Sequence, residues 1–210
     1  MMNVKKVAIH LACIAVLAPL FAQAEENPWM FRVRAVDLLF KNGQSGGDGT
    51  VQALSLNAQN QVIPEFDVTY FFTKNISAEL VLTYPQNVSI GSTLGNIGTI
   101  TALPPSLIAQ YHFTDYGNFI PYVGVGINYT IFGNRSNFPG LSNTVQVNQS
   151  SVGAVGQIGF DYMFNKNWGL NIDLKYITMA TDVTNIATGV NNGTLTLNPW
   201  APAIGITYKF

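Results

Sequence analysis

Apolar side chains recur at every second position in several segments of the chain. In residues 152–164 the even positions are almost all apolar or aromatic, whereas the odd positions are mixed and include Gln157 and Asp161. Residues 62–72 and 168–176 alternate in the same way. Because successive side chains of a β-strand point to opposite faces, this pattern predicts strands with one apolar face and one more polar face.

The same pattern predicts eight strands in the whole chain. Their expected ranges are Met30–Leu39, Gln61–Phe72, Ile76–Tyr84, Ser106–Phe113, Phe119–Phe132, Ser150–Phe164, Trp168–Thr181 and Leu195–Phe210. Short turns are expected at 73–75, 114–118 and 165–167, and they alternate with long connections at 40–60, 85–105, 133–149 and 182–194. The long connections are rich in Asn, Gly, Ser and Thr, so we expect mobile loops there.

The first 24 residues have the pattern of a secretory signal peptide. Lys5 and Lys6 precede a mostly apolar run over 7–20, and Ala22-Gln23-Ala24 is a small-residue cleavage site. The only cysteine, Cys13, lies inside this segment, so the predicted mature domain, residues 25–210, contains no disulfide.

Composition restricts the fold further. Charged residues make up 10% of the chain, against about 25% in ordinary soluble domains. Beyond residue 24, no stretch approaches the roughly 18 apolar residues of a membrane helix. A secreted all-β protein and a membrane barrel remain, and only the barrel requires an apolar outer face. A net charge of −1 with few basic residues gives no reason to expect a nucleic-acid partner.

Aromatic residues favour the barrel over a β-sandwich, because those with outward parity cluster beside the short turns and the C-terminus. They are Phe72, Phe113, Phe119, Phe164, Trp168, Tyr208 and Phe210, with Tyr84, Tyr129 and Trp200 expected at the opposite interface. Such belts mark the two surfaces of a membrane. We therefore predict an all-β fold, an eight-stranded antiparallel transmembrane β-barrel with both termini on the side of the short turns.

The chain resembles the outer-membrane protein W family. The likeness is carried by 103–110 (LPPSLIAQ), 121–129 (PYVGVGINY), 156–162 (GQIGFDY) and 198–200 (NPW), and it covers most of the chain from residue 62 onward. It implies an eight-stranded outer-membrane barrel linked to passage of small hydrophobic molecules, and some family members act as receptors for toxins or phage. The terminal Phe210 resembles the ending that barrel assembly machinery recognises, so we expect that machinery and outer-membrane lipids as partners.

Inward-facing residues divide by depth into two groups. Near the outer loops an apolar group, here called the cup, comprises Ile63, Val81, Ile108, Val155, Ile177, Met179 and Leu197. Below it a charged group, here called the plug, comprises Arg32, Arg34, Glu65, Asp67, Glu79, Asp161, Asp173 and Lys175. Buried ions are costly unless paired. We therefore expect Arg32 and Arg34 to face Glu65 and Asp67, and His112 and Lys209 also to point inward.

The predicted function is an outer-membrane conduit in which the cup accepts a small hydrophobic molecule and the plug blocks water and ions. Proline removes a ladder hydrogen bond, so Pro64, beside Ile63, suggests a sideways exit into the bilayer; a bulge that only shapes the barrel is the alternative. The alternative function is a non-conducting receptor or adhesin acting through the long loops.

We predict no enzymatic activity and no cofactor. Ser106 and His112 lie six residues apart on one strand, roughly 20 Å at strand rise, too far for a nucleophile–base pair. The sequence has no metal-binding cluster of His or Cys and no phosphate-binding loop.

Overall fold

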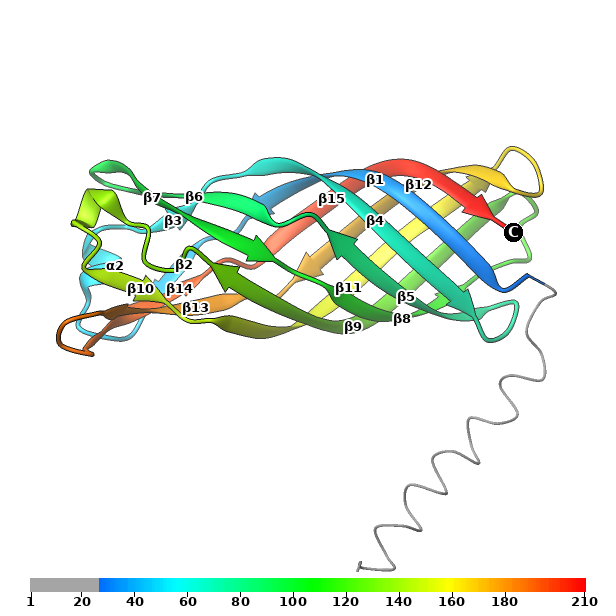
Figure 1. Ribbon diagram of the computed structural model, residues 1–210. Helices are drawn as coiled ribbons and strands as arrows, with labels where there is room; N and C mark the ends of the chain where they lie inside the picture. The colour runs from blue at the N-terminus through cyan, green and yellow to red at the C-terminus, as the bar shows by residue number, and fades with distance from the viewer. Residues whose placement is uncertain (1–26) are drawn as a thin grey trace, which may run out of the picture.

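The computed structural model describes residues 27–210, and the predicted signal peptide lies outside them. Eight antiparallel strands close into a barrel (Figure 1). In their order around the wall they are β1 (Trp29–Phe40), β4 (Gln61–Phe71), β5 (Ile76–Thr83), β8 (Ser106–His112), β9 (Phe119–Gly133), β11 (Ser150–Met163), β12 (Trp168–Ile177) and β15 (Pro199–Lys209). β15 pairs with both β12 and β1, so no edge remains, and the predicted fold class is confirmed.

At the level of the charged residues the wall is apolar outside and polar inside, the reverse of a soluble protein. On β1 the outward Val33 is 59% exposed, whereas its neighbour Arg32 is fully buried in the lumen. The predicted aromatic belt also faces outward at the end with the short turns. There Trp168 packs on Tyr208 at 4.7 Å between ring centroids, and Tyr208 packs on Phe210 at 4.8 Å.

The long connections are not the irregular loops that their composition suggested. They extend the barrel with β2 (Gly43–Ser45), α2 (Thr50–Ala53), β3 (Asn57–Ala58), β6 (Gln86–Ser92), β7 (Gly95–Leu103), the 3-10 turn η2 (Pro139–Leu141), β10 (Val145–Val147), β13 (Ala180–Asn185) and β14 (Asn191–Thr196). Figure 1 shows this extension at the end away from the C-terminus. Within residues 27–210 no helix has the length and apolar character needed to cross a membrane.

Apolar alternation inside the connections explains their order. Ile90, Ile100, Val147 and Leu195 are all buried in one apolar cluster that continues into the barrel. Their burial stabilises strands that the polar composition alone does not predict.

The seventh and eighth predicted strands are longer than the observed ones, because each predicted range is interrupted near the outer end. β12 stops at Ile177 and β13 begins at Ala180, while β14 stops at Thr196 and β15 begins at Pro199. Asn198 has a positive φ of 30°, and its side-chain oxygen accepts a hydrogen bond from the Met179 backbone at 2.7 Å. This local turn replaces regular pairing at the junction between barrel and extension.

Candidate ligand-binding lumen

The plug begins as pairs across two adjacent strands. The register of β1 and β4 sets Arg32 opposite Asp67 and Arg34 opposite Glu65. The closest contact is diagonal, with Arg34 Nη2 at 2.6 Å from Asp67 Oδ2, whereas Arg34 Nε is 3.5 Å from Glu65 Oε1. Arg32 and Arg34 therefore face Glu65 and Asp67, as the sequence suggests.

Further ion pairs join strands across the lumen. Arg32 reaches Glu79 on β5 at 2.6 Å and Asp161 on β11 at 2.7 Å. Arg34 also contacts Glu79 at 2.8 Å and Asp173 on β12 at 3.0 Å. Because each guanidinium has several donors in a fixed plane, two arginines on one strand connect carboxylates from four other strands.

Lys175 completes the plug. Its ammonium lies 2.7 Å from Glu65 and 2.9 Å from Asp173. The eight predicted plug residues therefore form one continuous network of three cations and five carboxylates, all at most 6% exposed. Charges buried this deeply are tolerated only when each is paired and hydrogen-bonded.

Neutral side chains that sequence reasoning did not select complete the network. Tyr122 donates a hydrogen bond to Asp173 at 2.7 Å, and its ring lies 4.9 Å from the Arg32 guanidinium carbon. Gln157 donates to Glu79 at 2.9 Å and to Asp173 at 2.8 Å. Gly159 provides the space for Tyr122, because a Cβ there would lie 2.5 Å from the phenolic oxygen. Tyr122 and Gln157 occupy inward positions in the alternation of their strands, and this was the feature of the sequence that could have identified them.

His112 and Lys209 also point inward, at the end of the barrel that carries the short turns. His112 is 1% exposed and packs between Phe71 and Tyr122, while Lys209 lies 4.9 Å from the Phe71 ring centroid. The hydroxyl near His112 belongs to Ser77, whose Oγ is 3.1 Å from Nε2, and not to Ser106. The absence of enzymatic activity remains a prediction.

All seven cup residues are buried, but they fall into two apolar clusters. Six of them join the large cluster shared with the extension, namely Val81, Ile108, Val155, Ile177, Met179 and Leu197. Ile63 belongs to a second cluster with Val36, Leu38 and the alanines of β15, and Phe40 packs against both clusters. The cup is thus continuous with the core of the extension, which sequence reasoning did not foresee.

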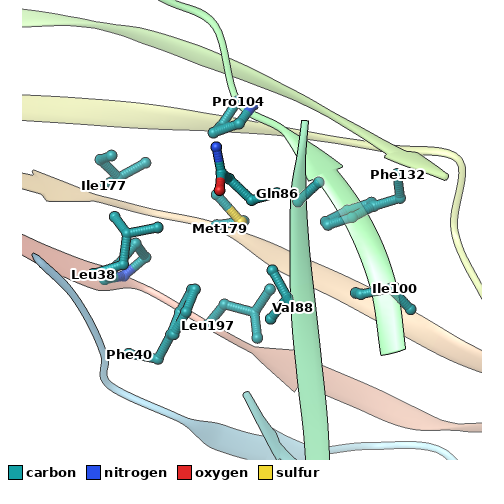
Figure 2. A pocket seen from close by; sticks show the side chains of 12 residues that line it. Leu38, Phe40, Gln86, Val88, Ile100, Pro104, Phe132, Ile177, Met179 and Leu197 are labelled. Carbon is teal, nitrogen blue, oxygen red and sulfur yellow. The ribbon is translucent and has the colours of Figure 1, made fainter. Parts of the chain in front are cut away.

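A small apolar cavity lies where these clusters meet. Figure 2 shows its lining, in which Ile177, Met179 and Leu197 of the cup are joined by side chains from β1, β6, β7 and β9. Its volume is about 30 Å³, enough for water but far below the roughly 300–1,000 Å³ of a ligand pocket. A bound molecule therefore requires displacement of lining side chains.

The barrel wall is interrupted close to this cavity. Pro64 is paired with Ala35 of β1. On its other side the β4–β5 ladder ends at the pair Glu65 and Thr83, so Pro64 has no partner on β5. The side-chain nitrogen of Gln61 and the hydroxyl of Thr83 are both buried without a hydrogen-bond partner. The wall beside Pro64 is therefore incomplete on one side only.

A second gap adjoins the first. The β5–β8 ladder ends at Val81 and Ser106, and pairing resumes only at Gln86 and Ala102 in β6 and β7. Prolines at 85, 104 and 105 lie between these pairs, where a missing N–H prevents ladder formation. The Gln86 side-chain amide donates to the Tyr84 carbonyl. Gln86 and Pro104 also line the cavity, which places the gap and the cavity next to each other.

Residues 28–210 match the OmpW family. The chain belongs to this family. Outer membrane protein W of Vibrio cholerae is 32% identical over 98% of this chain and 100% of its own length. The outer-membrane protein y4mB of Sinorhizobium fredii is 40% identical over 88% of this chain and 80% of its own.

Solved structures give the same result. The crystal structure of OprG from Pseudomonas aeruginosa has a TM-score of 0.74 and 26% identity, covering 90% of this chain and 98% of that one. The protein is therefore an outer-membrane β-barrel of the OmpW family, and the resemblance seen in its sequence is confirmed.

Proposed function

We propose that this barrel is a conduit for small hydrophobic molecules, which enter the cup from outside and leave sideways through the wall. The plug blocks passage along the barrel axis, because its ion pairs fill the lumen below the cup. A molecule in the cup then leaves through the wall into the bilayer. The observation that carries the proposal is the pair of adjoining gaps in the wall. One lies beside Pro64 where the β4–β5 ladder ends, and the other lies beside Pro104 where the β5–β8 ladder ends, next to the cavity.

The chemistry of the cup selects apolar molecules. The cup is aliphatic, and the cavity beside it adds the aromatic Phe40 and Phe132. Burial of apolar surface gains about 25 cal/mol per Å². Since the cavity is only about 30 Å³, entry requires the extension and cup side chains to separate. Met179 lies among the lining residues, and its flexible thioether adapts to such displacement.

The exit is tested by closing the gap with a reversible cross-link. Continuing the β4–β5 register by one step sets Pro64 opposite Tyr84. Because the only cysteine of the chain is Cys13, Pro64→Cys combined with Tyr84→Cys introduces one defined pair into residues 25–210. Uptake of a hydrophobic fluorophore is measured in cells that make the oxidised or the reduced variant.

We expect the oxidised variant to take up the fluorophore several-fold more slowly than the reduced form of the same variant. The reduced form is the reference because replacing Pro64 by itself restores a ladder donor. Each single-cysteine variant serves as the control, since neither can cross-link within the wall. If mass spectrometry verifies the disulfide and uptake still equals that of the reduced protein, the sideways exit is wrong.

A second candidate function is a non-conducting surface receptor. It is favoured by the small cavity and by the strand-rich extension, which presents a shaped surface to the exterior. The discriminating measurement is uptake by variants of the cup: a receptor tolerates a charge there if it folds, whereas a conduit does not.

A further inference from the structure

The wall has a second kind of interruption, which is polar and lies away from Pro64. The β11–β12 ladder ends at Val155 and Ile177, although β11 stays paired with β9 up to Ser150. The next regular pair on this side joins Val147 of β10 to Val183 of β13. Between them, the outer end of β11 and the start of β13 lie next to each other without a regular ladder.

Two isolated backbone hydrogen bonds, from Thr178 N to Ala154 O at 2.9 Å and from Asn148 N to Asp182 O at 3.2 Å, cross this interruption, and side chains bridge it as well. Ala154 N donates to Thr178 Oγ1 at 2.7 Å, and Ala180 N donates to Ser151 Oγ at 3.2 Å. Farther out, the Asn148 side-chain amide donates to Asp182 Oδ2 at 3.1 Å. These bonds join the strands but leave a hollow of about 450 Å³, lined by residues that include Ser151, Val152, Thr178, Asp182, Thr196 and Asn198.

The lining has the chemistry of a site for neutral hydroxyl groups. It consists mainly of hydroxyl and amide side chains, which both donate and accept hydrogen bonds. It includes no Lys or Arg, and its one charge, Asp182, repels phosphate. Across residues 27–210 there is no group of three His, Cys, Asp or Glu able to hold a metal. An uncharged polyhydroxyl group suits these side chains better than an anion or a cation.

The position of the hollow points to a membrane lipid as the source of that group. Just below it on the outer wall, Tyr176 and Trp200 pack at 4.8 Å between ring centroids, and Trp200 is 44% exposed. Val152, which lines the hollow, is 75% exposed. Aromatic residues of this kind mark the headgroup level of a barrel. An amphiphile would thus meet apolar wall below and hydrogen-bonding groups above.

We propose that this hollow binds the neutral saccharide headgroup of a glycolipid in the outer leaflet, with the lipid chains lying along the wall below Trp200. The saccharide hydroxyls donate to Asp182 and exchange hydrogen bonds with Thr178, Thr196 and Asn198. The site opens on the outside of the barrel. It shares Met179 with the cup, but its hydrogen-bonding side chains belong to neither the cup nor the cavity, so the proposal does not rest on the conduit.

The test uses the isotope-labelled protein in phosphatidylcholine nanodiscs. Increasing fractions of diglucosyl diacylglycerol, a neutral glycolipid, are added, and backbone amide shifts are followed. We expect saturable shifts at 148–154, 178–182 and 194–198. Thr196→Val removes a hydroxyl without changing the side-chain shape. It should weaken binding about five-fold, the effect of one hydrogen bond. Asp182→Asn should also weaken it.

Thr99→Val is the matched control, because Thr99 is a half-buried threonine on β7 of the same extension but outside the hollow. It should bind as the native protein does. Equal shifts on adding phosphatidylglycerol would overturn saccharide recognition. Equal affinity for free maltose would overturn the lipid source, and unchanged affinity of folded Thr196→Val and Asp182→Asn would overturn the site itself.

Discussion

At the scale of single residues, burial determines how much each charge matters. Arg34 is 2% exposed and contacts four carboxylates, so removing it leaves the five carboxylates of the plug with only Arg32 and Lys175 as counter-ions. Lys74 and Asp115 also form an ion pair, at 3.6 Å, but both are largely exposed to solvent. The same type of interaction is therefore structural in one place and weak in the other.

Arg34→Ala should destabilise the barrel by roughly 3–5 kcal/mol, because breaking a buried ion pair leaves uncompensated charge. The free energy of unfolding is measured by urea titration of the barrel in lipid vesicles. Lys74→Ala, the matched control, should change it by less than about 1 kcal/mol. Equal effects of the two substitutions would show that the plug does not support the fold.

A charge in the cup should stop uptake. Ile177 lines the cavity and is 7% exposed, so Ile177→Asp replaces an apolar contact with a desolvated carboxylate. Ile108→Asp, at the lower edge of the cup, should act in the same way. Uptake of a hydrophobic fluorophore should fall to the level of cells without the barrel, while Ile177→Val retains most of it. Normal uptake by folded Asp variants would favour the receptor.

At the scale of elements, prolines and side-chain bridges determine where the wall is continuous. Pro64 terminates pairing toward β5 but not toward β1, and the prolines at 85, 104 and 105 separate β5 and β8 from β6 and β7. On the other side, where the ladder is irregular, side-chain hydrogen bonds of Thr178 and Ser151 supplement isolated backbone bonds. The two interruptions therefore differ: the first is apolar and adjoins the cavity, and the second is polar and bridged.

Pro64→Val should restore a ladder donor and allow β4 to pair farther along β5. We expect slower uptake with an unchanged amount of folded barrel, because a completed ladder strengthens the wall. Hydrogen exchange of the amides at 62–66 and 82–84 provides the structural measurement, and protection should rise there. Pro121→Val, on the continuous β9–β11 ladder near the short turns, is the control and should leave uptake as it was.

At the scale of the whole molecule, closure joins the two ends of the chain. Phe210 N donates to Trp29 O at 3.2 Å, and the Phe210 ring packs on Phe31 and Tyr208. The terminal aromatic thus lies on the outer wall at the closing strand pair, where it is 51% exposed. At this position Phe210 is accessible to other proteins before β1 and β15 pair, and it packs on Phe31 and Tyr208 once they have paired.

Deleting Phe210 should lower the amount of assembled barrel in cells several-fold but should allow the purified chain to refold in detergent. The expectation follows if assembly machinery recognises the terminal Phe210, because the folded barrel itself loses only one exposed ring. Heat-modified migration of outer-membrane fractions measures assembly. Phe164→Ala removes an exposed aromatic from the same belt and should assemble normally. If both variants assemble equally poorly, the aromatic belt as a whole, and not the terminal residue, is what assembly requires.

The N-terminal prediction concerns processing of the whole chain. Cleavage after Ala24 should give a mature protein that begins at Glu25, because Ala22-Gln23-Ala24 fits the small-residue site that follows a signal peptide. Intact-mass measurement of the outer-membrane form checks this directly. Ala24→Leu should block cleavage at that position, and a mature form lacking more or fewer residues would correct the boundary.

The sequence by itself determined the strands and their faces, because alternation is a local property of an extended chain. It identified Arg32 and Asp67 as inward, Phe164 and Trp168 as lipid-facing, and the first six strand ranges to within a residue or two. Parity also separated the charged plug from the apolar cup. None of these results depends on knowing which distant strands lie opposite each other.

Tertiary structure decided everything that depends on closure and register. Arg32 contacts Asp161, 129 positions away, because the curvature of the wall sets them across the lumen. The separate cluster around Ile63, the strands formed in the long connections and the cavity of about 30 Å³ depend on how the extension packs onto the barrel. Alternation specifies which face a side chain occupies, whereas the partner on that face follows only from the three-dimensional arrangement of all eight strands.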